Sequence, residues 1–275
     1  MLDFIQLIQG FATPFTDAFL TVFNMLSQQY FLVFLVALIY WIIDKSKGEQ
    51  LAYSLLLTIN ISCGIKGIFK IPRPYTYEGI RVLNKSTAPG YSFPSADSSA
   101  AASVAFTIGT WIKKPVFKWL LAVYVILIGF CRIYFGLHFP TDVLAGFTIG
   151  VIVAYGIKRI LNNIKDTFKL NIMLVLVLLL FALWKQEPDY YKTLGLILGA
   201  VAGIEIEHKF VNFSNDISLS KKIVRLALGL TGIIIIALLS SQFMPDGNIY
   251  YVIEKFLLTF FAVGVYPWIF KRFGF

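Results

Sequence analysis

Long apolar stretches recur along the whole chain, and they limit its possible folds more than any other feature of the sequence. Nine runs of about 15–23 residues are nearly free of charge, close to the ~20 residues that a helix needs to cross the hydrocarbon core of a membrane. The runs are continuous and lack the alternation of apolar and polar residues that membrane strands require. Hydrophobic residues make up 58% of the chain, against about 45–50% in soluble domains. We therefore expect an all-α fold, a polytopic membrane helical bundle.

The nine runs predict nine membrane spans. Their expected ranges are 28–43, 50–71, 95–112, 117–134, 139–157, 170–185, 190–206, 223–242 and 249–270. Residues 1–28 mix apolar with polar residues, so we expect one or two interfacial helices that break near Gly10 and Pro14, with a shallow or re-entrant span as the alternative. A basic connector at 158–169 separates a first half with most of the unusual polar residues from a second half of four spans.

The basic residues alternate between the loops, and this alternation predicts the orientation of the chain. Most of the 24 Lys and Arg residues would share one side of the membrane: Lys45, Lys47, Lys113, Lys114, Lys118, Lys158, Arg159, Lys165, Lys169, Lys209, Lys221, Lys222, Arg225, Lys271 and Arg272. The positive-inside rule places that side and the C-terminus in the cytoplasm, and the loops 72–94 and 135–138 outside. Because no basic residue precedes Lys45, we expect no cleaved signal peptide. The expected compartment is a bacterial plasma membrane, and the net charge of +9 forms no nucleic-acid-binding pattern.

Three polar segments interrupt the apolar sequence on the side predicted to be extracytoplasmic. The second span ends near Lys66 and Arg73, the third begins with Pro94-Ser95-Ala96-Asp97, and the segment Cys131–Asp142 joins the fourth span to the fifth. The last segment holds His138, one of only two histidines in the chain. Charged groups beside membrane spans are costly, so we interpret them first as functional.

These residue types predict a site for a phosphate group. Lys66, Arg73 and Arg132 are cations, and arginine forks match phosphate oxygens while lysine supplies a point charge. Pro94-Ser95 is expected to open a helix, whose first backbone N–H groups can face an anion. Asp142 follows His138 by four residues; a carboxylate that holds one ring nitrogen leaves the other nitrogen free to attack.

Each of these residues also has a purely structural interpretation. A single basic residue at the end of a span is usually a membrane anchor, and a lone histidine at a helix start is usually a cap. The serines at 95, 98 and 99 are also typical of a small-residue packing face. The spacing of the three segments and their shared side favour the phosphate site. Cys63 and Cys131 lie in or near spans and indicate neither a disulfide framework nor a metal site.

Together the three segments resemble the signature of the type 2 phosphatidic acid phosphatase (PAP2) superfamily. The likeness rests on Lys66 with Arg73-Pro74, on Pro94-Ser95, and on Arg132 with the run 136–142, and it covers about residues 50–160. The resemblance implies a phosphatase core over 29–160, preceded by N-terminal helices over 1–28 and followed by a transmembrane extension over 161–275.

The resemblance also implies a role for each site residue. His138 would be the nucleophile that forms a phosphohistidine, and Asp142 would orient it. The phosphate would be bound by Lys66, Arg73, Ser95, the amide of Ala96 and Arg132. No metal or other cofactor would be needed. The partner would be a membrane lipid with a phosphate or diphosphate headgroup, and no oligomeric state follows from the sequence.

The second segment departs from the family pattern. The superfamily has Pro-Ser-Gly-His, whose histidine protonates the leaving group, where this chain has Pro94-Ser95-Ala96-Asp97. Asp97 therefore stands in the position of the general acid, although three nearby cations would keep a carboxyl group ionised at neutral pH. His208 falls on the predicted cytoplasmic side and cannot replace the missing histidine. A milder departure is Cys131, since serine usually precedes the arginine in the family.

Three functions stay open at this point. The first is a phosphatase for a lipid whose leaving group needs little protonation, such as a polyprenyl (undecaprenyl) diphosphate or a related phospholipid. The second is a catalytically silent relative that binds or transports a phosphorylated lipid. The third is a lipid phosphotransferase.

The second half of the chain offers fewer signals. Gly195, Gly199 and Gly203 repeat at a spacing of four, which predicts that a neighbouring helix approaches closely. Glu205 and Glu207 are expected at the cytoplasmic interface, with a proton or substrate path as the alternative. The last four spans could be a structural wrap, a dimer face or a substrate channel.

Overall fold

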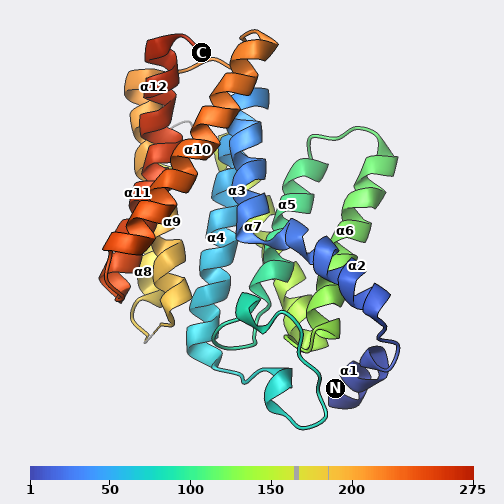
Figure 1. The fold of residues 1–275 in the computed structure, drawn as a ribbon. Helices are drawn as coiled ribbons and strands as arrows, with labels where there is room; N and C mark the ends of the chain where they lie inside the picture. The colour runs from blue at the N-terminus through green and yellow to red at the C-terminus, as the bar shows by residue number, and fades with distance from the viewer. Residues whose placement is uncertain (164–166, 185) are drawn as a thin grey trace.

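The computed structural model describes residues 1–163, 167–184 and 186–275, so Lys165 of the basic set lies outside the described residues. The described residues form helices and loops, with no β-strand among them (Figure 1). The first half contains α1 (Leu2–Gln9), α2 (Pro14–Asn24), α3 (Gln29–Leu38), α4 (Lys45–Phe69), α5 (Ala96–Gly109), α6 (Pro115–Tyr134) and α7 (Pro140–Asn163). The second half contains α8 (Thr167–Phe181), α9 (Pro188–Ile206), α10 (Leu219–Phe243), α11 (Asn248–Phe260) and α12 (Tyr266–Phe273). The all-α prediction is confirmed.

Short helical turns extend or connect these helices: η1 (Met25–Ser27), η2 (Ile39–Ile43), η3 (Pro74–Thr76), η4 (Lys85–Thr87), η5 (Glu207–Val211) and η6 (Phe261–Val265). Five helical segments of the described chain are long and apolar enough to cross a membrane: Lys45–Thr76, Pro115–Tyr134, Pro140–Asn163, Leu219–Ser240 and Asn248–Phe273. The pair Pro14–Ser27 and Gln29–Ile43, bent by 47°, gives a sixth candidate. The protein is therefore an integral membrane protein.

The remaining predicted spans coincide with helices that are shorter or less apolar than a typical span. α5 has only 14 residues and is rich in serine and alanine, and most of its residues are buried. α4 and α7 pack on it, so α5 needs no apolar outer surface of its own. α8 and α9 cover most of the predicted spans 170–185 and 190–206.

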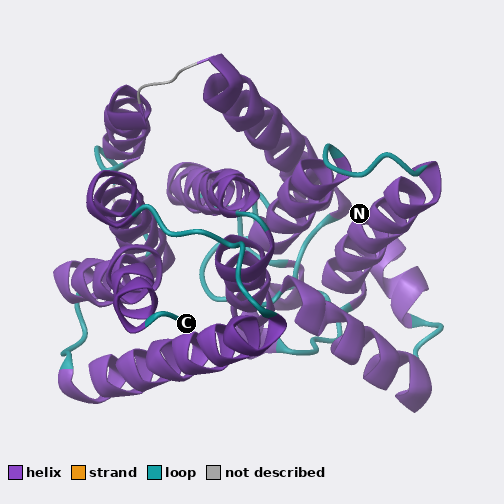
Figure 2. Ribbon diagram, turned by 90° about the horizontal axis from the view of Figure 1, so that it is seen from above, coloured by secondary structure: helices purple, strands orange, loops and turns teal. Residues whose placement is uncertain are grey.

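The helices run up and down, and this places the three polar segments at one end of the bundle. In Figure 1 the N-terminus, the loop after α4 and the turn between α6 and α7 lie at the lower end, and the C-terminus lies at the upper end. Figure 2 looks down on the bundle and shows several helices nearly end-on, as expected of helices that cross a membrane together.

Small residues allow α5 and α7 to pack closely. A side chain added at Gly150 of α7 would overlap the carbonyl oxygen of Ser99, and one added at Gly146 would lie 2.6 Å from the carbonyl oxygen of Ser95. The Ser99 hydroxyl hydrogen-bonds within this layer to Ser62 of α4, at 2.8 Å between the two Oγ atoms. The small-residue packing weighed for the serine run is therefore present in the structure.

The glycine repeat of α9 packs against α11 and η6. A side chain at Gly195 would overlap the carbonyl oxygen of Val252, one at Gly199 would overlap that of Phe256, and one at Gly203 would lie 3.0 Å from the backbone nitrogen of Gly264. The predicted close helix approach is confirmed, and the partners are α11 and the η6 turn that follows it.

The two halves share one hydrophobic core. Trp41 of η2 donates from Nε1 to the carbonyl oxygen of Ala262 at 3.0 Å, and Asn60 of α4 donates to Oγ1 of Thr193 in α9 at 2.9 Å. Arg225 of α10 donates to the carbonyl oxygen of Trp41 at 3.0 Å. α9 therefore packs on α4, α10 packs on α3 and η2, and η6 is bound to η2 through Trp41. The boundaries 1–28, 29–160 and 161–275 stay predictions.

The N-terminal helices are fastened to the long loop after α4. Thr13 caps α2 through a reciprocal capping box with Thr16, and Pro14 occupies the first turn, so the helix starts where the sequence predicted a break. Asp17 forms two hydrogen bonds with the Arg81 guanidinium, at 2.7 and 2.8 Å. Gln9 donates to the carbonyl oxygens of Arg81 (2.7 Å) and Tyr134 (2.9 Å). α1 and α2 thus hold the loop and the end of α6 together.

Candidate active site

The three polar segments meet at the end of the bundle that carries the N-terminus. Lys66, in the last turn of α4, donates from Nζ to the carbonyl oxygens of Tyr91 (2.8 Å) and Ser92 (3.1 Å). Ser92 donates its hydroxyl to Oδ2 of Asp142, in the first turn of α7, at 2.5 Å. The predicted convergence of the segments is therefore present in the fold.

Arg73 is held by backbone carbonyl oxygens from two loops. Its Nε donates to Gly90 at 2.9 Å, its Nη2 to Pro89 at 2.7 Å and its Nη1 to Leu137 at 3.0 Å. No carboxylate pairs with this guanidinium among the ion pairs of the described residues. The side chain is rigidly placed, and its positive charge is not cancelled by a direct counter-ion.

The same guanidinium defines the tautomer of His138. Nη1 of Arg73 lies 3.0 Å from Nε2 of His138. A guanidinium has donors only, so Nε2 accepts this hydrogen bond, and the single proton of a neutral imidazole is assigned to Nδ1. Nε2 therefore directs its lone pair toward the cations. A phosphate that takes up the Arg73 donor would meet this nitrogen.

Asp142 lies behind His138, on the side away from Arg73. Its Oδ2 is 3.5 Å from Nδ1 of His138, longer than a strong hydrogen bond, and both side chains are buried. The same oxygen accepts from the backbone nitrogen of Phe139 at 2.8 Å as well as from Ser92. Asp142 is thus fixed at the Nδ1 side of the ring. Catalytic hydrogen bonds of this kind are often long in an unliganded enzyme and shorten with substrate.

Arg132 and Asp97 form an ion pair at the front of the site. Nη2 of Arg132 lies 2.8 Å from Oδ2 of Asp97; the arginine side chain is fully buried and the aspartate side chain is 23% exposed. Nη1 of Arg132 also donates to Thr87 Oγ1 (3.3 Å) and Asn24 Oδ1 (3.4 Å). The residue in the position of the family's general acid is therefore a counter-ion to one of the predicted phosphate-binding residues.

The two residues at the start of α5 differ in their surroundings. Ser95 is buried and caps the helix; its hydroxyl accepts from the Ser98 backbone nitrogen at 3.4 Å and lies 2.8 Å from the Ser98 hydroxyl. Its own backbone nitrogen donates to the carbonyl oxygen of Asp142 at 3.0 Å. Ala96 lines the cavity described below, whereas Ser95 is not among its lining residues.

A cavity of about 350 Å³ adjoins these groups. The predicted site residues that line it are Lys66, Arg73, Ala96, Asp97, Arg132 and His138. Ser95 and Asp142 lie behind this lining. The cations outnumber the carboxylates in the lining, so the cavity suits an anion such as a phosphate group.

His138 is buried among positive charges, and this sets its protonation. Burial, followed by the charges of Lys66, Arg73 and Arg132, holds the pKa of the His138 imidazole well below its usual range. The ring is therefore neutral at physiological pH. A neutral imidazole with a free lone pair is the form that can act as a nucleophile.

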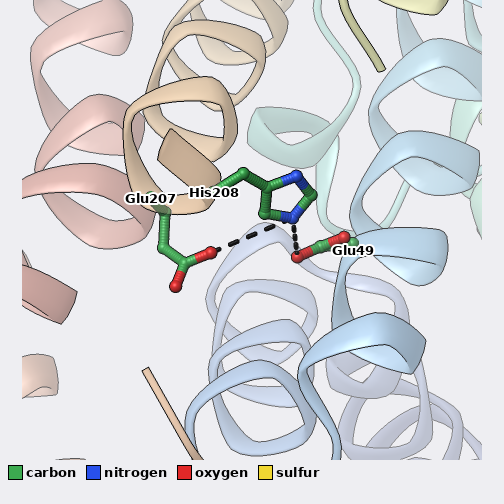
Figure 3. Close-up of side chains that lie close together, drawn as sticks. All are labelled: Glu49, Glu207 and His208. Carbon is green, nitrogen blue, oxygen red and sulfur yellow. Dashed lines mark hydrogen bonds and ion pairs between the residues drawn. The ribbon is translucent and has the colours of Figure 1, made fainter. Parts of the chain in front are cut away.

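The second histidine lies at the other end of α4, far along the helix from the candidate site. Figure 3 shows His208 beside Glu49 and Glu207; its Nε2 is 2.8 Å from Glu49 Oε1 and 3.9 Å from Glu207 Oε2. Among the described residues, these three have ligand atoms within 4.8 Å of one another, the spacing of a metal site. Lys45 already pairs with Glu207 at 3.0 Å, so the cluster is satisfied as an ion-pair network.

Sequence reasoning missed three residues that hold the site. Ser92 bonds Asp142, and Asn24 and Thr87 bond Arg132. No spacing rule connects these positions to the motif residues, because each lies in a loop or helix end whose path only the fold determines. The polar character of Asn24 within an apolar helix was the one available signal.

Comparisons with known proteins identify the family of the chain. A family model described as "PAP2 superfamily" matches residues 48–166, and one described as "PAP2 superfamily phosphatase, transmembrane extension" matches residues 191–275. The chain belongs to the PAP2 superfamily. The PAP2 match contains every predicted site residue, and the second match covers α10, α11, α12 and most of α9.

Curated relatives of this PAP2 protein are lipid phosphatases. A probable sphingosine-1-phosphate phosphatase from Dictyostelium discoideum is 25% identical over 71% of this chain and 54% of its own length. An undecaprenyl-diphosphatase from Sulfolobus acidocaldarius is 26% identical over 39% of this chain and 52% of its own length. The chain thus spans about half the length of these relatives. A crystal structure of Aquifex aeolicus LpxE is similar with a TM-score of 0.50 and 31% identity, over 57% of this chain and 94% of that one.

Proposed function

We propose that this PAP2 protein hydrolyses a phosphorylated membrane lipid through a phosphohistidine on His138, and that its favoured substrate is a polyprenyl diphosphate such as undecaprenyl diphosphate. The observation that carries the proposal is the 3.0 Å contact between Arg73 Nη1 and His138 Nε2 inside a cavity that Lys66 and Arg132 also line. This contact directs the lone pair of the proposed nucleophile to the place where a phosphate would be bound.

The reaction would proceed in two displacements. Nε2 of His138 attacks phosphorus, a P–N bond forms, and the P–O bond to the leaving group breaks with its electron pair on oxygen. Lys66, Arg73, Arg132 and the Ala96 amide stabilise the charge on the three equatorial oxygens. Asp142 accepts from Nδ1–H and stabilises the positive ring. Water then attacks phosphorus and releases inorganic phosphate, which restores the imidazole.

The state of Asp97 favours a diphosphate as the substrate. Asp97 forms an ion pair with Arg132 at 2.8 Å, so we assign it as a counter-ion to that arginine and not as the proton donor to a leaving group. A lipid diphosphate expels a phosphate monoester, which needs much less protonation than the alkoxide that a lipid monophosphate would expel. Relatives named for diphosphate and for monophosphate substrates both occur, so relatedness alone does not choose between them.

We place the site on the extracytoplasmic face of the membrane. The support is the charge pattern: the loops at the opposite end carry most of the Lys and Arg residues, and positive loops stay inside. A lipid headgroup would then reach His138 from the outer leaflet. The C-terminus would lie in the cytoplasm of a bacterial cell.

One observation favours the second candidate function, a silent relative that binds or transports a phosphorylated lipid. Asp97 occupies the Arg132 guanidinium, and the histidine that would act as general acid in the family is absent. A lipid phosphotransferase is the third candidate; it would use the same phosphohistidine with a lipid hydroxyl in place of water.

The experiment that separates these functions measures phosphate release by the purified protein from farnesyl diphosphate and from phosphatidic acid. We expect faster release from the diphosphate, loss of release in His138→Ala, and a phosphorylated protein that this variant does not form. No release from either lipid between about pH 4 and 8 would exclude the phosphatase. Transfer of labelled phosphate to an added lipid alcohol would favour the phosphotransferase.

A further inference from the structure

We propose that the C-terminal helices form one wall of a site for the hydrocarbon chain of the substrate lipid, and that this site runs from His138 along α4 to a floor at Trp41. The inference rests on the proposed function for its headgroup end. Its own support is the extent, lining and closure of the cavity.

The cavity that adjoins His138 continues beyond the cations, into the space between the two halves of the chain. α3 and α4 line it on one side, and α9, α10 and α11 line it on the other. Its lining there is apolar, as shown by Val36, Leu55, Ile59, Leu196, Ile233 and Leu258. An anion site and an apolar site are therefore parts of one cavity, which is the arrangement that an amphiphilic ligand requires.

The cavity is long and narrow. Lys66 and Ala52 both line it and lie fourteen residues apart on α4, which corresponds to about 21 Å at 1.5 Å per residue. That length is roughly two-thirds of the ~30 Å hydrocarbon core of a membrane. A volume of about 350 Å³ spread over this length is enough to accommodate one extended chain.

On α9, as on α4, the residues that line the cavity change from charged to apolar with distance from the phosphate site. Asp189 and Lys192 line it at the start of α9, where they pair with each other at 3.1 Å, and this end of α9 lies beside the end of α4 that carries Lys66. Leu196 and Ala200 follow on the same helix and carry no charge. On α9 the charged residues therefore lie toward Lys66 and the apolar residues lie farther along the cavity; on α11, Lys255 also lines the cavity and pairs with Glu254 at 2.7 Å.

Two rings of η2, which follows α3, line the end of the cavity that lies away from His138. Trp41 and Tyr40 line the cavity and are almost completely buried. Trp41 Nε1 donates to Ala262 at 3.0 Å and Tyr40 Oη donates to Val263 at 3.3 Å, so both rings are fixed to η6. A chain that enters past His138 meets these rings after a fixed length. The site should therefore select chains by length.

Such a site can select between lipid chains but adds little to the overall affinity for the lipid. The lipid bilayer is as apolar as the cavity, so moving a chain from one to the other brings little hydrophobic gain. The walls can discriminate only by length and width. A structural wrap or a dimer face would need no internal cavity, and the lining residues Ala200, Tyr40 and Trp41 are buried and unable to contact a second molecule.

The direct test is photo-crosslinking of the protein in nanodiscs with hexadecyl phosphate that carries a diazirine at its terminal carbon. We expect labelling of residues around Ala200 and Ala262, and loss of that labelling when excess unlabelled hexadecyl phosphate is added. Labelling confined to outward-facing side chains such as Leu176 and Leu239, or labelling that survives competition, would overturn the inference.

A pair of variants tests the same site by a second readout. Ala200→Phe fills the cavity, and we expect at least a tenfold loss of terminal labelling and a preference for shorter alkyl phosphates. Ala202→Phe adds the same ring to the same helix at a position outside the cavity lining and should behave as the wild type. Trp41→Leu replaces a large ring with a smaller side chain and so lengthens the cavity, which should shift the preference toward longer alkyl chains.

The two proposals fail in different ways. If competed labelling is found without phosphate release, the chain site stands and the phosphatase proposal fails. If phosphate is released but Ala200→Phe has the same relative preference for butyl phosphate and hexadecyl phosphate as the wild type, the phosphatase proposal stands and the chain site is overturned. The wild-type labelling pattern decides the inference even if a variant does not fold.

Discussion

Oδ2 of Asp97 lies 2.8 Å from Nη2 of Arg132, and this pair joins the residue that stands in place of the family's general acid to an arginine that conforms to the family pattern. The guanidinium is fully buried and the carboxylate is 23% exposed. The buried partner cannot move to water, whereas the carboxylate can. An incoming phosphate can therefore displace Asp97 and take its place on Arg132.

This relationship predicts that Asp97→Asn strengthens phosphate binding. Without the carboxylate, Arg132 lacks an anionic partner, so inorganic phosphate should bind about tenfold more tightly or better, while the unliganded protein loses about 1–3 kcal/mol of stability. Thermal unfolding with and without phosphate measures both effects. Asp216→Asn removes an exposed charge at the other end of the bundle and serves as the control. Equal phosphate stabilisation in Asp97→Asn and wild type would contradict the displacement.

Restoring the family pattern predicts a change in substrate preference. The double variant Ala96→Gly with Asp97→His supplies a proton donor to the leaving group, and general acid catalysis contributes typically 10²–10⁴-fold. We expect phosphatidic acid hydrolysis to rise by that order, with a much smaller rise for a diphosphate. The ratio of kcat/KM for the two lipids is the measurement. An unchanged ratio would mean that proton donation does not limit the natural site.

Arg73→Lys tests whether the hydrogen bonds from Arg73 to three backbone carbonyl oxygens position its charge for phosphate binding. A lysine cannot donate at once to Pro89, Gly90 and Leu137, so the cation would no longer hold a phosphate against His138. Loss of one preorganised donor costs about 10²–10³ in kcat, which is the fall we expect. Lys70→Asn is a matched control, because Lys70 is exposed nearby in a left-handed conformation that asparagine tolerates. Similar losses in both variants would argue against a specific role for Arg73.

The two histidines predict opposite effects of pH on stability. The pKa of His138 is held well below its usual range by burial, so below about pH 6.5 the unfolded chain binds a proton that the folded chain does not. Its contribution is present above that pH and is lost as the pH falls, by up to about 1.4 kcal/mol per unit. Glu49 raises the pKa of His208, so its contribution is full below about pH 6.5 and is lost as the pH rises through the raised value.

Unfolding temperatures between about pH 7.5 and 5.5 check these signs. His138→Gln should make the protein less sensitive to acid, and His208→Gln should make it more sensitive. A shift of both variants in the same direction would refute the assignment of a neutral His138.

The close contact between α9 and α11 predicts that a single added methyl group lowers the stability of the protein. Gly199→Ala drives a side chain into the carbonyl oxygen of Phe256, and overpacking of this kind costs about 1–3 kcal/mol. Gly156→Ala in α7 meets nothing within 4 Å and should be neutral or slightly stabilising. Thermal unfolding of the two variants measures the difference, and equal stability would show that α9 can shift away without loss.

The sequence was a good guide to the helices and to the members of the site. Apolar runs predict helices because the membrane leaves the backbone few alternatives. The motif residues share one face because spans alternate in direction, so Lys66, Arg73 and His138 could be grouped without coordinates. Their roles stay predictions.

The partners of these residues could not be predicted in the same way. Asp97 could have faced the lipid, the cavity or Arg132, and only the packing of α5 against α6 decides between them. Ser92, Asn24 and Thr87 approach the site through loops whose path depends on many weak contacts. Ser95 caps α5, because a buried serine at a helix start satisfies the nearest backbone N–H.

The attachment of Gln9 and Asp17 to Arg81 has a consequence for the chemistry. The loop that they anchor continues to Pro89 and Gly90, whose carbonyl oxygens orient Arg73. The first two helices therefore anchor one part of this loop, and the Arg73 guanidinium is bound to another part of it. We therefore expect that a deletion at the N-terminus loosens this loop and makes the position of the Arg73 guanidinium less fixed, although the deleted residues lie far from any reacting atom.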